Sequence, residues 1–163
     1  MGSPKERLCK TLVLENLSVP TLSSCEYPLG WTKENYSLAQ SRYIAVVVPY
    51  VHKLEIPALS RFVRRASPSG LVKSDTQALP NIVHAENGEV LTGFPFNGIS
   101  VFGGKIGMPI ILCKAILEAV GPSYIWLGGG EVDLKLRIPI AQLAAYSHVC
   151  DCSVERPSFF EED

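Results

Sequence analysis

The sequence predicts a single α+β domain spanning residues 1–163, in which two or three helices pack on an antiparallel-rich sheet with two hairpins. Two glycine-containing turns, at Asn87-Gly88 and at residues 128–130, lie between runs of strand-forming residues and predict the hairpins. The helical patterns are isolated and do not alternate regularly with strands, which disfavours a doubly wound parallel sheet. A small β-barrel with a helical cover is the alternative.

The first half of the chain is expected to contain two strands and two helices. Residues 10–15 alternate enough for a strand, and residues 43–48 (YIAVVV) form an unbroken apolar run, typical of a central strand covered on both faces. Thr32 is suited to cap a short helix over residues 33–41. Pro57 suits the first position of a helix that continues to residue 66. The apolar stripe of this helix consists of Leu59, Phe62, Val63 and Ala66.

The middle of the chain is expected to hold a long loop, a hairpin and a buried helix. Residues 67–81 are loop-like and exceed the usual loop length of compact domains. Asn87-Gly88 predicts a type I′ hairpin between residues 82–86 and 89–94, because this turn needs positive φ at both central residues. A further strand is expected over residues 98–102. Pro109 then suits the start of a helix over residues 109–120 that is apolar on nearly all sides.

The last third of the chain is expected to form the second hairpin, from residues 123–127 and 131–138, and a helix over residues 139–146. Residues 1–9 and 153–163 are expected to be peripheral tails. Alternation in the second strand predicts one core-facing side and one solvent-facing side. The expected core side consists of Val132, Leu134, Leu136 and Ile138, and the solvent side of Glu131, Asp133, Lys135 and Arg137.

Charge and cysteine content limit the class of protein. The formal net charge of −1 argues against a generic nucleic-acid binder. The first 75 residues hold 10 Lys/Arg and 6 Asp/Glu and the rest hold 5 and 10, a split that suits head-to-tail association unless folding intermixes the halves. No apolar stretch approaches the length of about 18 residues that a transmembrane segment needs. Five cysteines without a secretory signal predict reduced thiols in the cytoplasm, with the nucleus not excluded.

Two small groups of residues are candidate ligand sites. Gly103, Gly104, Lys105 and Gly107 lie before the expected helix, where glycines and free N–H groups could bind an anion, although the Walker and G-x-G-x-x-G spacings are missing. Packing at a tight junction would also explain these glycines. His148, Cys150 and Cys152 form H-x-C-x-C, but the paired spacing typical of zinc sites is missing. We therefore expect neither a metal nor a cofactor.

A basic helix face is the candidate polyanion site. Arg61, Arg64 and Arg65 lie opposite the apolar stripe, and Lys73 follows closely. Such a face could contact RNA or an anionic membrane surface. A solvated helix surface is the commoner explanation.

These observations favour a non-catalytic structural or assembly protein that forms homo-oligomers and contacts a polyanion. The sequence lacks a nucleophile elbow or another catalytic constellation, and 47% of its residues are hydrophobic. The order of strands and apolar helix resembles that of small viral matrix or coat proteins, although no motif is shared. The alternative is a small ligand-binding domain or enzyme that uses the loop of residues 103–107 as an anion site at a helix N-terminus.

Overall fold

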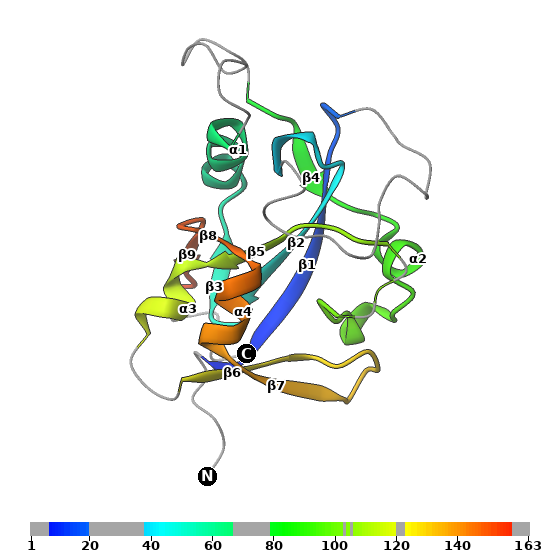
Figure 1. Cartoon of the computed structure of the whole chain (residues 1–163), viewed down its shortest axis with the longest axis vertical. Helices are drawn as coiled ribbons and strands as arrows, with labels where there is room; N and C mark the ends of the chain where they lie inside the picture. Colours follow the sequence, from blue (N-terminus) through cyan, green and yellow to red (C-terminus); the bar gives the residue numbers. More distant parts are fainter. Residues whose placement is uncertain are drawn as a thin grey trace.

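The computed structural model describes residues 7–19, 38–66, 79–102, 104, 106–119 and 123–157. These residues form an α+β fold with a five-stranded mixed sheet, two two-stranded sheets and four α-helices (Figure 1). The predicted fold class is therefore confirmed. Strand pairing among the described residues does not close on itself, so the barrel alternative is wrong.

The main sheet has the strand order β4-β1-β2-β5-β8. β1 (Cys9–Asn16) runs antiparallel to β2 (Tyr43–Pro49) and β4 (Ile82–His84), whereas β5 (Ile110–Cys113) runs parallel to β2 and to β8 (His148–Cys150). All seven residues of β2 are buried, because a central strand is covered on both faces. The predictions of β1 and of a central β2 are thus confirmed.

Two helices form where their sequence patterns predict them. α1 (Ile56–Arg65) has Pro57 in its first turn and buries Leu59 and Val63 in the core. α4 (Ile140–Tyr146) buries Ile140 and Leu143. Of the helix expected over residues 33–41, the described part is a short 3-10 turn, Leu38–Gln40. β9 (Ser153–Glu155), in the segment expected to be a tail, pairs with β3 (His52–Leu54).

The apolar helix predicted over residues 109–120 is wrong. Its first part is the strand β5, and only α3 (Lys114–Glu118) is helical. β5 begins with the β-branched residues Ile110 and Ile111, and it lies between β2 and β8 in the sheet. A fully buried strand and a buried helix have the same uniformly apolar pattern, so periodicity did not separate them.

The hairpin predicted at Asn87-Gly88 is also wrong. β4 pairs with β1 instead of with the following residues, and α2 (Gly88–Thr92) begins directly after Asn87. Asn87 has a φ of −109°, which is incompatible with a type I′ turn. The strand expected over residues 98–102 is absent too, and the 3-10 turn Phe96–Gly98 leads into irregular backbone.

The second hairpin is confirmed with a longer loop than expected. β6 (Tyr124–Gly128) pairs with β7 (Lys135–Pro139), so β7 begins four residues later than predicted. Leu136 and Ile138 face the core as expected. Val132 and Leu134 are 49% and 50% exposed, because they belong to the turn and not to the strand.

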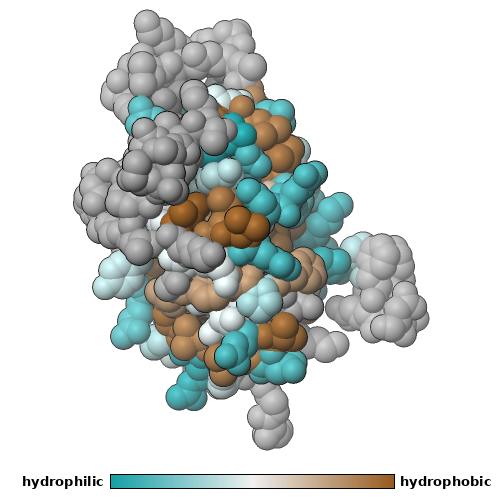
Figure 2. Space-filling model, turned by 90° about the vertical axis from the view of Figure 1, so that its right-hand side faces the viewer, coloured by the Kyte–Doolittle hydropathy of each residue, from teal (hydrophilic) through white to brown (hydrophobic). Residues whose placement is uncertain are grey.

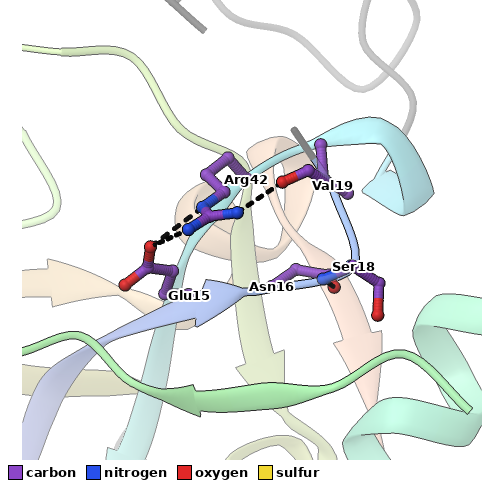
Figure 3. Close-up of polar contacts among 5 residues, drawn as sticks. All are labelled: Glu15, Asn16, Ser18, Val19 and Arg42. Carbon is purple, nitrogen blue, oxygen red and sulfur yellow. Dashed lines mark hydrogen bonds and ion pairs between the residues drawn. The ribbon is translucent and has the colours of Figure 1, made fainter. Parts of the chain in front are cut away.

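An ion pair connects the end of β1 to the start of β2. The Arg42 guanidinium donates two hydrogen bonds to Glu15 Oε2, the Nε contact at 2.9 Å, and a third to the carbonyl oxygen of Val19 (Figure 3). The two side chains are only 14% and 17% exposed. Arg42 therefore has a structural role and adds no free charge to a polyanion surface.

Candidate functional site

Among the described residues, part of one edge of β1 has no strand partner. β2 pairs along β1 from Cys9 to Glu15. On the opposite edge, β4 pairs only with the end of the strand, from Leu14 onward, and Leu8 forms an isolated bridge with Trp126 of β6. A cavity of about 680 Å³ lies along the edge between these two contacts.

Thr11 lies at the centre of this open edge. The carbonyl oxygen of Val13 accepts a hydrogen bond from the Ala85 amide at 2.9 Å, so the backbone polar groups of Val13 point away from β2. Since this direction repeats every second residue, the amide and carbonyl of Thr11 point to the same edge. Thr11 is 9% exposed, and its Oγ1 has no hydrogen-bond partner among the described residues. The strand edge thus presents backbone donors and acceptors to the cavity.

Lys10 places a cation in the same cavity. Its side chain is half-buried, and its ammonium lies 5.9 Å from the centre of the Tyr50 ring. Desolvation by burial, together with the nearby positive charge of Arg156, lowers the pKa of Lys10 below its usual value. Lys10 makes no ion pair with a described residue. Its charge is therefore available to a ligand.

The other titratable groups of the cavity differ sharply in chemistry. Burial raises the pKa of the Cys9 thiol to about 12, so this side chain stays protonated and is a poor nucleophile. Glu86 and Glu89 also line the cavity and are exposed, as is His84 at the end of β4. The cavity thus combines a cation on β1 with carboxylates near α2.

Close backbone contacts hold one wall of the cavity in place. A Cβ on Gly128 would lie 2.3 Å from the carbonyl oxygen of Ile99, and a Cβ on Gly98 would lie 2.6 Å from the backbone of Glu131. The Gly130 amide also donates a hydrogen bond to the Gly98 carbonyl at 2.8 Å. Only glycine permits such an approach. The loop that carries Ile99 is therefore packed directly against the β6–β7 hairpin.

A second cavity, of about 470 Å³, shares Ile99, Thr11 and Val13 with the first. The strand register places Thr11 and Val13 on the same sheet face as Ala45 and Ile110, and all four residues line it. The lining is mostly apolar. Ile99 and the centre of β1 thus line both cavities.

The side of the molecule that carries α2 is shown in Figure 2. Apolar surface lies near its centre, with hydrophilic side chains around it. Two of the most exposed apolar residues, Val90 (71%) and Phe96 (74%), line the first cavity. A cavity with apolar exposed walls and a few polar groups is typical of small-molecule sites.

The glycine-rich loop that was predicted to bind an anion contributes to the wall of the second cavity. Gly104 and Gly107 line the second cavity, whereas Gly103 and Lys105 lie outside the described residues. The loop precedes the strand β5, not a helix. The expected helix N-terminus is therefore wrong, and anion binding by the loop residues stays a prediction.

The remaining predicted residues that the structure describes line neither cavity. Arg61 and Arg65 are exposed on α1 and Arg64 is half-buried there, while Lys73 lies outside the described residues. Cys150 and Cys152 are buried; the Cys152 Sγ lies 3.6 Å from the Cys113 Sγ. The His148 ring packs edge-on against Phe62 at 6.4 Å. No group of three or more potential metal ligands occurs in the described part of the chain, and none of its helices is long and apolar enough to span a membrane.

Sequence reasoning missed Lys10, Thr11, Tyr50 and Lys135. The one local signal was the lysine at the start of a predicted strand, in the run Cys9-Lys10-Thr11-Leu12-Val13. Its meaning depends on where β4 ends, which only the fold shows.

Comparison with known proteins identifies similar folds. No family model and no curated protein matches the chain. Three of the solved structures that match each have a TM-score of 0.62. A computationally designed epitope-grafting scaffold is 18% identical, with 96% of this chain and 78% of that chain covered. The hypothetical protein APE2540 is 17% identical, with 93% and 77% covered. A candidate trans-editing enzyme for prolyl-tRNA synthetase is 17% identical, with 95% and 74% covered.

These low identities show similarity of fold alone. They nevertheless correct the expectation of a non-catalytic structural or assembly protein, because the structures with this fold include a candidate enzyme. The alternative, a small ligand-binding domain or enzyme, fits the two cavities better.

Proposed function

We propose that this chain hydrolyses the ester that joins an amino acid to the 3′ end of a tRNA. The observation that carries the proposal is Lys10, a half-buried cation without an ion-pair partner among the described residues, inside a cavity at the open edge of β1. The fold shared with a candidate trans-editing enzyme supports the same reaction class.

The chemistry of the cavity matches an aminoacylated terminal nucleotide. Its volume of about 680 Å³ lies within the usual range of roughly 300–1,000 Å³ for small-ligand sites. Lys135 offers positive charge for a phosphate, and Glu86 and Glu89 offer negative charge for the α-ammonium group. The Thr11 backbone is placed to bond polar groups of the ribose or the amino acid.

The reaction needs a polarised carbonyl and an attacking water. Water adds to the ester carbonyl carbon. The carbonyl oxygen, on which negative charge develops, accepts a hydrogen bond from the Lys10 ammonium. The bond between the carbonyl carbon and the ribose oxygen then breaks, and that oxygen takes the proton that water loses. The products are the free amino acid and a tRNA with a free 3′ hydroxyl. Because the Cys9 thiol stays protonated, we assign no covalent thioester intermediate.

Deacylation assays test this proposal. A panel of tRNAs charged with different amino acids, including tRNAPro charged with amino acids other than proline, would be incubated with wild type and Lys10→Met. We expect wild type to hydrolyse at least one of them, with kcat/KM about 100-fold lower in Lys10→Met, the usual effect of losing one oxyanion donor. Lys114→Met, an exposed lysine on α3 outside both cavities, is the matched control. Wild type no faster than spontaneous hydrolysis, or Lys10→Met equal to wild type, would overturn the proposal.

A further inference from the structure

The β6–β7 hairpin has one apolar face and one face that carries rings and cations. Ile125 and Leu127 are fully buried, and their cross-strand partners Ile138 and Leu136 pack on the same core. Strand alternation therefore places the other residues on the outer face. We define the hairpin platform as Tyr124, Trp126, Lys135 and Arg137.

Arg137 is held over both rings of the hairpin platform. Its guanidinium carbon lies 5.1 Å from the centre of the Tyr124 ring and 5.9 Å from that of Trp126. The two rings themselves meet edge to face, 6.2 Å apart. Arg137 is exposed and makes no ion pair with a described residue. The platform thus presents a fixed cation beside aromatic surface.

The hairpin platform continues to the mouth of the first cavity. The Lys135 ammonium lies 5.6 Å from the centre of the Tyr50 ring, which the Lys10 ammonium approaches from β1. Tyr50 is 45% exposed. Lys10, Tyr50 and Lys135 all line the cavity. Cations and rings therefore form a continuous track from Arg137 to Lys10.

We propose that the hairpin platform binds the unpaired nucleotides of an RNA 3′ end whose terminal nucleotide occupies the first cavity. Single-stranded RNA is recognised by stacking of its bases on aromatic side chains or arginine, with lysine and arginine on its phosphates. Tyr124 and Trp126 provide the rings, and Lys135 and Arg137 provide the charge. The inference rests on the proposed function for the direction in which the RNA lies on the protein, but RNA binding itself requires no hydrolysis.

The basic face of α1 is the competing RNA surface and supplies the control. α1 lies in the upper half of Figure 1, and the β6–β7 hairpin lies at the lower end. Arg61 on α1 is exposed and lines neither cavity, so Arg61→Gln removes one charge without changing the hairpin platform. Arg137→Gln removes one charge from the platform.

Fluorescence anisotropy tests the inference with a 5′-labelled single-stranded RNA of about eight nucleotides that carries no esterified amino acid. We expect Arg137→Gln and Trp126→Leu to bind about tenfold more weakly than wild type, and Arg61→Gln to bind like wild type. Arg137→Gln should also reduce the slope of log K against log salt by about 0.7 between 50 and 200 mM, as for one lost phosphate contact. Equal binding by Arg137→Gln and wild type, a loss confined to Arg61→Gln, or binding to anionic vesicles in place of RNA would overturn the inference.

A second measurement separates this inference from the proposed function. The aminoacyl ester of adenosine lacks the preceding nucleotides, so its hydrolysis should be equal in wild type and Arg137→Gln. On aminoacyl-tRNA, kcat/KM should fall about tenfold in Arg137→Gln. A fall of the same size on both substrates would contradict a role in RNA binding. If no ester is hydrolysed but the platform variants still lose RNA affinity, the proposed function fails and the RNA surface is supported.

Discussion

Replacing Gly128 with alanine tests the role of the backbone contact that shapes the cavities. The added Cβ would lie 2.3 Å from the Ile99 carbonyl oxygen and 3.1 Å from its carbonyl carbon. To reach an ordinary contact of about 3.4 Å, the two backbones must separate by about 1 Å. Neither atom belongs to a side chain that can rotate away. Ile99 lines both cavities, so the same shift displaces their common wall.

We expect Gly128→Ala to lower the free energy of unfolding by about 2–3 kcal/mol, the upper part of the range for overpacking. With an m-value of about 2–3 kcal/mol per molar urea, the unfolding midpoint should fall by about 1 M. Urea titration followed by circular dichroism measures this shift, and the deacylation assay measures the effect on the site.

Gly104→Ala is the matched control. Its Cβ would meet its nearest neighbour, the Thr92 carbonyl oxygen, at 3.6 Å, which is an ordinary contact. We expect a change within about 0.5 kcal/mol. Unfolding of Gly128→Ala at the wild-type urea concentration would refute this prediction, as would an equal loss of stability in Gly104→Ala and Gly128→Ala.

Three further predictions concern β1. Lys10→Met should be more stable than wild type at pH 7, because burial and Arg156 lower the pKa of Lys10 below 10.5 and so penalise its charged form. That penalty is present below the folded-state pKa of Lys10 and disappears as the pH rises toward 10.5. Urea titrations should therefore show that the extra free energy of unfolding of Lys10→Met is smaller at pH 10 than at pH 7. An extra free energy of unfolding that grows with pH would contradict this. Thr11→Val should raise the free energy of unfolding by about 1 kcal/mol, since it replaces a hydroxyl without a described partner by a methyl group of similar size; a lower thermal midpoint would show that Oγ1 is bonded. Cys9 should resist iodoacetamide at pH 8 in peptide mass mapping, because its pKa is raised to about 12 and it is 1% exposed; its alkylation in the native protein would disprove the burial.

The local sequence pattern predicted an element correctly where that pattern is typical of one kind of element alone. The strand β1, the central strand β2, α1 behind Pro57 and α4 were all predicted from alternation, β-branched runs or helical stripes. The error over residues 109–120 arose because the partners of β5 are β2 and β8, which lie far away in the sequence. Parallel pairing leaves no turn signal beside the strand.

The candidate site was harder to predict because it depends on an absence of pairing. Asn87-Gly88 favours a hairpin locally, but β4 pairs with β1, and this pairing extends along β1 only from Asn16 to Leu14. This pairing replaces the expected hairpin, and it leaves the edge of β1 beside Thr11 without a strand partner in the described part of the chain. Lys10 then becomes a cavity residue through the fold alone, and no short motif marks it. The contacts at Gly98 and Gly128 likewise join two loops whose proximity no local pattern reveals.

The most direct test of the central claim is a crystal structure with a non-hydrolysable analogue, an adenosine whose 3′ oxygen is replaced by an amide link to an amino acid. The expected result is that the analogue occupies the cavity along β1, with Lys10 Nζ at a hydrogen-bond distance of about 3 Å from the amide carbonyl oxygen. An analogue bound on α1, or bound with its carbonyl oxygen remote from Lys10, would contradict it.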